Sequence, residues 1–339
     1  MKRTVSIVML LAGLYLSLSP KAEAAGLCCQ LSSGVQESLS GVAAPGDQEA
    51  TVQFTYSFTR MDKIKEGSTE RSLDSVKATT AYTSLPVSMD MMKYTLTAGY
   101  GFSRDLKAFV SIPFIRNTMD MTSRGMMGWM DMTMAPVSGL GDITVMGLYR
   151  LRSDREIRPT NAVTLGLGVK TASGSSTERS ASGKLVHAHM QPGTGSWDPL
   201  ISVMYTRMAN PFLFQADATY QYTTKNRQAY EFGNSMAINV SGKYAVVKEF
   251  NITAGLTYLD VGRASDPDGR YYNPATNSSL MDDPANTGGK SLWFSPGIQL
   301  FPVKNGMIDL KYQVPVRETV NGVQLVSSYR YLVGISYNF

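Results

Sequence analysis

Apolar and polar residues alternate with a period of two along most of the chain beyond its first fifty residues. Tyr94 and Leu96 fall on one face of a segment, and Thr95 and Thr97 fall on the other. Successive side chains of a β-strand point to opposite faces, so this period predicts strands. Twelve such segments are predicted, near residues 50–61, 91–102, 106–117, 141–152, 160–171, 197–208, 211–223, 233–246, 250–260, 291–302, 306–317 and 323–339.

The polar face of these segments is rich in Thr, Ser, Gly, Gln and Asn and carries few charges. The outer face of a soluble β-sandwich would normally carry more charge. A sparsely charged polar face instead suits the wet interior of a membrane barrel, with the apolar face toward lipid. Each segment has about ten residues or a little more, which is the length that crosses a bilayer at a tilt.

The connections between the segments alternate between short and long. Short ones lie at 103–105, 209–210, 247–249 and 303–305, with a modest one at 153–159. Long ones lie at 62–90, 118–140, 172–196, 224–232 and 261–290, and only the last connection, near 320–322, is tight. Short periplasmic turns, long extracellular loops and an even strand number are typical of outer-membrane barrels. The predicted fold is therefore all-β, a transmembrane antiparallel β-barrel of about 12 strands.

The two ends of the chain carry export signals. Residues 1–24 combine Lys2 and Arg3, a short apolar stretch and a small-x-small cleavage site, which is typical of a secretory signal peptide. Residues 25–48 fit no strand and are expected to be a periplasmic or plug segment, which leaves 49–339 for the barrel. At the other end, the alternation runs through Tyr337 to a terminal Phe339. This ending resembles the sorting signal that the barrel-assembly machinery recognises.

The composition excludes several other classes of protein. Only 17% of residues are charged while 43% are hydrophobic, which argues against a cytosolic enzyme and against disorder. The net charge of +5 is mild and falls to +3 without the signal segment, so nucleic-acid binding has no support. The chain has two histidines, both in a predicted loop, and no catalytic triad or zinc-hydrolase motif. No enzyme is predicted.

Charged residues gather on one face of the predicted strands. If that face lines the lumen, the interior is polar and net positive, and it would favour anions or polar solutes. The alternative is that these charges only pair to stabilise the barrel. Twelve strands lie between the filled eight-stranded and the open sixteen-stranded barrels, so a narrow path is expected. The candidate lumen residues are Lys93, Arg150, Lys170, Asp217, Lys243, Asp309, Lys311 and Arg330, with Lys107 and Arg152 on the same face.

Methionine is abundant, with 20 residues, and it is concentrated around the second long connection. Thioethers are soft ligands that suit Cu(I), and two loop histidines would add imidazole. The alternatives are a pliable apolar lid over the barrel mouth and an incidental composition. The candidate metal ligands are Met121, Met126, Met127, Met130, Met132, His187 and His189. The adjacent Cys28 and Cys29 form a vicinal disulfide, a soft metal site or an incidental pair of thiols.

Three short motifs follow one another in the middle of the chain. Ser-Gly-Leu-Gly-Asp spans 138–142, Gly-Val-Lys-Thr-Ala-Ser-Gly spans 168–174, and Gln-Pro-Gly-Thr-Gly-Ser-Trp-Asp spans 191–198. Together they resemble the "MetA-pathway of phenol degradation" family of outer-membrane transporters. In that family a Gly-x-Gly-Asp strand start, a Lys-x-Pro-x-Gly-like strand end and a Pro-Gly-x-Gly-Ser-x-Asp strand start recur in this order. The chain departs from the family pattern at Ala172, which replaces proline.

The resemblance implies a barrel that passes small molecules, often aromatic or hydrophobic ones. The motif residues are expected where the chain enters strands, as tight bends braced by carboxylates, with ligand binding as the alternative. They are Gly139, Gly141, Asp142, Gly193, Gly195 and Asp198.

Three functions therefore stand side by side. The first is a bacterial outer-membrane channel for small molecules, whose partners are membrane lipids, the assembly machinery and the solute. The second is a copper-handling barrel that uses a Met-rich external loop, with Cu(I) as the one cofactor considered. The third is a receptor or structural barrel through which no solute passes.

Overall fold

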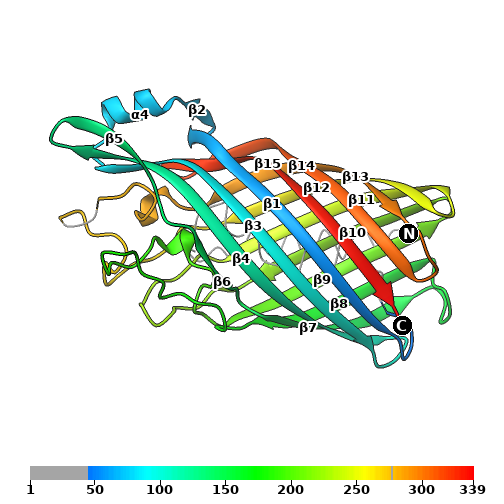
Figure 1. Ribbon diagram of the computed structural model, residues 1–339. Helices are drawn as coiled ribbons and strands as arrows, with labels where there is room; N and C mark the ends of the chain where they lie inside the picture. Colours follow the sequence, from blue (N-terminus) through cyan, green and yellow to red (C-terminus); the bar gives the residue numbers. More distant parts are fainter. Residues whose placement is uncertain (1–44, 276–277) are drawn as a thin grey trace, which may run out of the picture.

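The computed structural model describes residues 45–275 and 278–339. Within them, twelve antiparallel strands form a closed barrel (Figure 1), because the last strand pairs with the first. The predicted fold and strand number are confirmed. The barrel strands are β1 (Ala50–Glu66), β3 (Ser84–Gly101), β4 (Leu106–Gly125), β7 (Thr144–Ser153), β8 (Asn161–Lys170), β9 (Asp198–Ala209), β10 (Phe212–Gln221), β11 (Ser235–Val247), β12 (Phe250–Val261), β13 (Gly289–Leu300), β14 (Gly306–Val320) and β15 (Val323–Asn338).

The alternation along each strand separates an apolar exterior from a polar interior. In β1, the side chains of Val52 and Phe54 are exposed, whereas those of Thr51 and Gln53 between them are buried. In an isolated barrel, exposed apolar residues are those that lipid would cover. Both faces of β1 are therefore used, one toward the bilayer and one toward the lumen.

The remaining elements lie in the long connections at one end of the barrel, called here the loop end. The opposite end, where β1 starts and β15 finishes, has only short connections and is called the turn end (Figure 1). A hairpin of β4 and β5 extends past the barrel wall at the loop end. The loop-end elements are β2 (Thr69–Arg71), α4 (Leu73–Thr79), β5 (Gly128–Thr133), β6 (Val137–Leu140) and the short 3-10 helices η1 (Ala188–Met190) and η2 (Pro284–Asn286).

Three strands are longer at the loop end than the sequence predicted. β1, β3 and β4 extend into the predicted loops 62–90 and 118–140. The inward side chains there include three methionines, Met89, Met119 and Met121. Orientation still alternates along these strands, but the polarity is reversed, because the inward side chains are apolar and the outward ones, such as Asp90 and Asp120, are polar. A prediction based on polarity therefore ends each strand too early.

No helix among the described residues has the length and apolar character needed to span a membrane. The predicted signal peptide, residues 1–24, and most of the predicted segment 25–48 lie outside the described residues.

Candidate functional site

Three connections pack together at the loop end and share a small aromatic core. They join β8 to β9, β10 to β11, and β12 to β13. Tyr230 stands at the centre, with its ring 4.9 Å from that of Phe232 and 5.0 Å from that of Tyr271. The Tyr271 hydroxyl also donates a hydrogen bond to the carbonyl of Ser176, at 3.2 Å. These connections therefore form one body, called here the loop cap.

The loop cap reaches into the barrel. Asn117 lies on the inner face of β4, and its side-chain amide donates a 3.1 Å hydrogen bond to the carbonyl of Met190 in η1. Met190 is fully buried against inward residues of the barrel wall, among them Met61 and Met89. The connection between β8 and β9 is therefore folded inward instead of projecting outward.

A buried ion cluster anchors that connection to the wall. The Lys170 ammonium, at the end of β8, lies 3.2 Å from Asp142 and 2.6 Å from Asp198, and all three side chains are at most 8% exposed. Asp142 also accepts hydrogen bonds from the backbone N–H groups of Gly174 and Thr194, at 3.0 and 2.7 Å. Lys170 thus joins the starts of two strands and both ends of one loop.

The glycines of the motifs allow the loop ends to touch each other. A Cβ atom at Gly193 would lie 2.5 Å from the backbone of Gly174, and one at Gly174 would lie 2.7 Å from that of Gly141. Gly195 has a φ of +73°, which glycine adopts without strain. Gly139 sits against Pro192. Each predicted motif residue thus lies at this junction, with Asp142 and Asp198 bracing it.

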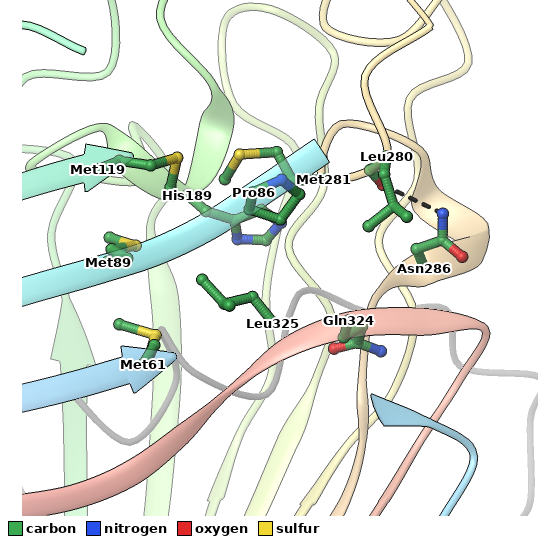
Figure 2. A pocket seen from close by; sticks show the side chains of 10 residues that line it. All are labelled: Met61, Pro86, Met89, Met119, His189, Leu280, Met281, Asn286, Gln324 and Leu325. Carbon is green, nitrogen blue, oxygen red and sulfur yellow. Dashed lines mark hydrogen bonds between the residues drawn. The ribbon is translucent and has the colours of Figure 1, made fainter. Parts of the chain in front are cut away.

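A small, partly open apolar cavity lies between the loop cap and the inner wall (Figure 2). Its walls come from β1, β3, β4 and β15 on one side and from the loop cap on the other. On the loop side, Asn286 donates a 3.1 Å hydrogen bond to the carbonyl of Leu280, which fixes that wall. The lining residues are Met61, Pro86, Met89, Met119, His189, Leu280, Met281, Asn286, Gln324 and Leu325.

Three lining methionines form a row across neighbouring strands. Met61 of β1 is directly opposite Met89 of β3, and Met89 is directly opposite Met119 of β4. Their exposed fractions are 0%, 2% and 1%. This row is called the methionine ladder below. Sequence reasoning did not group these three residues into one site, because they are far apart in the chain and only strand register aligns them.

Both histidines lie in the loop cap, His187 half-buried and His189 buried, in different electrostatic settings. Nδ1 of His187 lies 2.7 Å from Asp282. Burial alone would lower the pKa of His187, but the Asp282 carboxylate outweighs burial and raises it. Burial lowers the pKa of His189 to about 4, so its imidazole is neutral at physiological pH.

The predicted metal ligands are divided between two places. Met126, Met127, Met130 and Met132 are exposed on the β4–β5 hairpin, whereas Met121, His187 and His189 are buried or half-buried inside the loop end. The structure therefore does not bring the predicted set together. Among the described residues, no group of three or more His, Cys, Asp or Glu side chains is arranged around a common point that would hold a metal.

Most predicted lumen charges lie on the inner face and contact polar neighbours. Asp309 and Lys311 form a 2.9 Å ion pair, and Lys243 is close enough to both for electrostatic interaction. Nε of Arg330 donates a 2.9 Å hydrogen bond to the Thr59 hydroxyl. The interior is therefore charged, but much of the charge is paired.

The other predicted lumen residues lie at different depths. Lys93 is 1% exposed on β3, and Asp217 accepts a 3.1 Å hydrogen bond from Asn239 of β11. Arg150 bonds Asp105 at 2.6 Å near the turn end. The predicted inward position of Arg152 is wrong, because a strand irregularity between Arg150 and Arg152 leaves Arg152 exposed.

The predicted sorting signal lies on the outer face at the turn end. The side chains of Tyr337 and Phe339 are 43% and 68% exposed, and their rings meet edge to face at 5.0 Å. Their reading by the assembly machinery stays a prediction.

The family described as "Putative MetA-pathway of phenol degradation" matches residues 79–330. No curated protein matches this sequence. Among solved structures, the COG4313 outer membrane channel from Pseudomonas putida F1 has a TM-score of 0.57 at 14% identity, covering 87% of this chain and 97% of that one.

Two further structures are more distant. The translocator domain of the autotransporter NalP from Neisseria meningitidis has a TM-score of 0.46 at 8% identity, covering 91% and 95% of the two chains. The Pseudomonas putida toluene transporter TodX has a TM-score of 0.44 at 10% identity, covering 88% and 93%. The match to the COG4313 outer membrane channel shows the fold of an outer-membrane barrel, and the matched family is one of channels and transporters, not an enzyme family.

Proposed function

The chain belongs to this MetA-pathway of phenol degradation family, and we propose that it forms a bacterial outer-membrane channel for small, largely apolar molecules. The loop end would face the outside and the turn end the periplasm, because long loops are extracellular in such barrels. The observation that carries the proposal is the apolar cavity beneath the loop cap.

The cavity has the properties of a small-molecule binding site at the entrance of the barrel. Its walls are mainly methionine, leucine and proline, with the side-chain amides of Asn286 and Gln324 at one edge. Apolar walls with a few polar groups are typical of small-molecule sites. Methionine adapts to different shapes and makes favourable contacts with aromatic rings. Beyond the cavity the inner face is polar, so an apolar solute would be bound at the mouth and released toward water.

The binding step is tested by filling the cavity. Leu325→Trp places a large side chain in the cavity. The probe then loses packing contacts with the cavity walls, so we expect at least about tenfold weaker binding of a fluorescent apolar probe such as 1-naphthol. The measurement is a fluorescence titration of the refolded full chain in detergent. Met127→Trp, on the exposed hairpin, is the matched control and should bind like the parent. Equal affinity in Leu325→Trp would contradict the proposal.

The passage step is tested through the charged inner face. We expect single-channel conductance in a planar bilayer, with a reversal potential in a salt gradient that moves toward cation selectivity in Lys93→Glu and Lys311→Glu. Lys304→Glu, in an exposed turn, is the control and should leave the reversal potential unchanged. A well-folded barrel without conductance or uptake of the probe into vesicles would favour a receptor instead.

A further inference from the structure

We infer that the cavity beneath the loop cap is also a binding site for a soft monovalent metal ion, Cu(I), held by the methionine ladder together with Met281 and His189. This inference concerns the same cavity as the proposed solute site, but it does not depend on whether any solute passes. It places copper inside the barrel mouth and away from the exposed methionine-rich hairpin.

The register of the strands brings three thioethers together. Met61, Met89 and Met119 occupy directly opposite positions on three adjacent strands, all turned inward. Side chains directly opposite on neighbouring strands have Cβ atoms about 5 Å apart. A methionine side chain has three rotatable bonds beyond Cα, so three sulfurs at this spacing can converge on one ion.

The loop cap adds donors from the facing side. Met281, from the connection between β12 and β13, and His189, from η1, both line the same cavity as the ladder (Figure 2). Figure 2 shows the four thioethers and the imidazole around one space. Thioether with imidazole is a donor set that selects Cu(I) over hard cations, because both ligand types are soft or borderline.

The charge of the surroundings fits a monovalent ion. None of the ten lining residues carries a carboxylate. Hard divalent cations such as Ca²⁺ and Mg²⁺ prefer carboxylate oxygen ligands, so this cavity does not suit them. Asp282 lies close by, where it interacts electrostatically with His189 and bonds His187 at 2.7 Å.

The exposed methionines lack this arrangement. Met126 and Met127 lie at the tip of the β4–β5 hairpin with their side chains fully in solvent. Binding an ion with these sulfurs would cost conformational entropy, because the exposed side chains rotate freely and would have to be fixed around the ion. The ladder sulfurs are already buried and packed, so their ordering is achieved by folding itself.

The test is competition for Cu(I) between the refolded full chain and a coloured Cu(I) chelator, bathocuproine disulfonate, under anaerobic conditions. Every variant carries Cys28→Ser and Cys29→Ser, because those thiols would bind Cu(I) by themselves. We expect the parent to retain one Cu(I) per chain. Replacing Met61, Met89 and Met119 by Leu should weaken retention at least about 100-fold, since even second-shell changes cost 10–100-fold.

The matched control replaces Met126, Met127, Met130 and Met132 by Leu and should retain Cu(I) like the parent. Cu(I) retention and 1-naphthol binding are measured separately on the parent chain, so each site has its own readout. Failure of the metal site and failure of the solute site are therefore distinguishable. Equal Cu(I) retention by the parent and the ladder variant, or loss only in the hairpin variant, would overturn the inference.

A second measurement does not depend on folding of the ladder variant. X-ray absorption at the copper edge of the Cu(I)-loaded parent should show sulfur as the main scatterer with a nitrogen contribution. His189→Gln should remove the nitrogen contribution and keep the sulfur. A spectrum with only nitrogen and oxygen scatterers, or no copper bound by the parent, would refute the site.

Discussion

Two groups of methionines lie in the same part of the barrel wall and have opposite surroundings. Met126 and Met127 stand at the tip of the β4–β5 hairpin in full contact with solvent, whereas Met61, Met89 and Met119 are at most 2% exposed. The first group is dense along the sequence and the second is scattered along it. The comparison teaches that, in a barrel, proximity across strands builds a site and proximity along the chain does not.

The hairpin is held by contacts close to its turn and is free only at the turn itself. The guanidinium of Arg124 lies 4.8 Å from the ring centre of Trp129, and the Lys77 ammonium lies 5.9 Å from it. Gly128 has a φ of +109°, which only glycine adopts easily, and this permits the tight reversal. The tip methionines therefore project beyond every packed surface.

The ladder is buried because a loop covers it. That cover depends on the Lys170 cluster, which fixes both ends of the connection between β8 and β9. The covered ladder and the exposed hairpin should therefore respond differently to the same kind of change.

Lys170→Met should have the largest effect. It leaves Asp142 and Asp198 buried without their shared cation, and removal of one partner of a buried ion pair costs about 3–5 kcal/mol. The free energy of unfolding in urea, measured in detergent, should fall by that amount, and protease should reach the loop. The ladder would then resemble the exposed hairpin.

Arg104→Met is the matched control for Lys170→Met. Its partner Glu156 is 80% exposed in a turn, and exposed pairs contribute about 0–1 kcal/mol. A loss in Lys170→Met no larger than in Arg104→Met would show that the cluster does not anchor the cap.

Met61→Ala should destabilise the barrel by about 2–5 kcal/mol, because it leaves a hole among buried side chains. Met126→Ala removes the same atoms from an exposed side chain and should change the free energy of unfolding by less than about 0.5 kcal/mol. The measurement is paired urea titrations. Equal effects would mean that the ladder is not packed as described.

The loop cap should open at alkaline pH while the hairpin does not respond. Burial, with the nearby Asp282 and Asp266, raises the pKa of Tyr271 to about 12 from its ordinary value near 10. The neutral phenol is thus favoured by folding. Its contribution to stability is complete below pH 10 and is lost as the pH rises toward about 12.

Absorbance of tyrosinate, followed together with protease access to the loop cap, measures this opening. Tyr271→Phe cannot ionise and should remove that part of the pH dependence, at the cost of the hydrogen bond to Ser176. If protease access to the loop cap in Tyr271→Phe rises with pH as it does in the parent, another group is responsible for the opening.

The fold could be predicted because a barrel strand carries its own signature. Each of the twelve barrel strands matches a predicted segment, since the lipid on one side and the polar lumen on the other impose a period of two. The prediction ended too early in β1, β3 and β4, where inward methionines replace inward threonines. The motif residues were also found, because they match the family pattern that the sequence resembles.

The sequence by itself determined the barrel, its strand number and the bends at Gly141, Asp142 and Asp198, since local polarity and backbone constraints act over a few residues. Only the tertiary structure decided which methionines are buried and what faces them. Met61 and Met119 become neighbours through strand register, and Met281 and His189 reach them through folded loops. Register and loop docking depend on contacts between distant parts of the chain, which no local pattern contains.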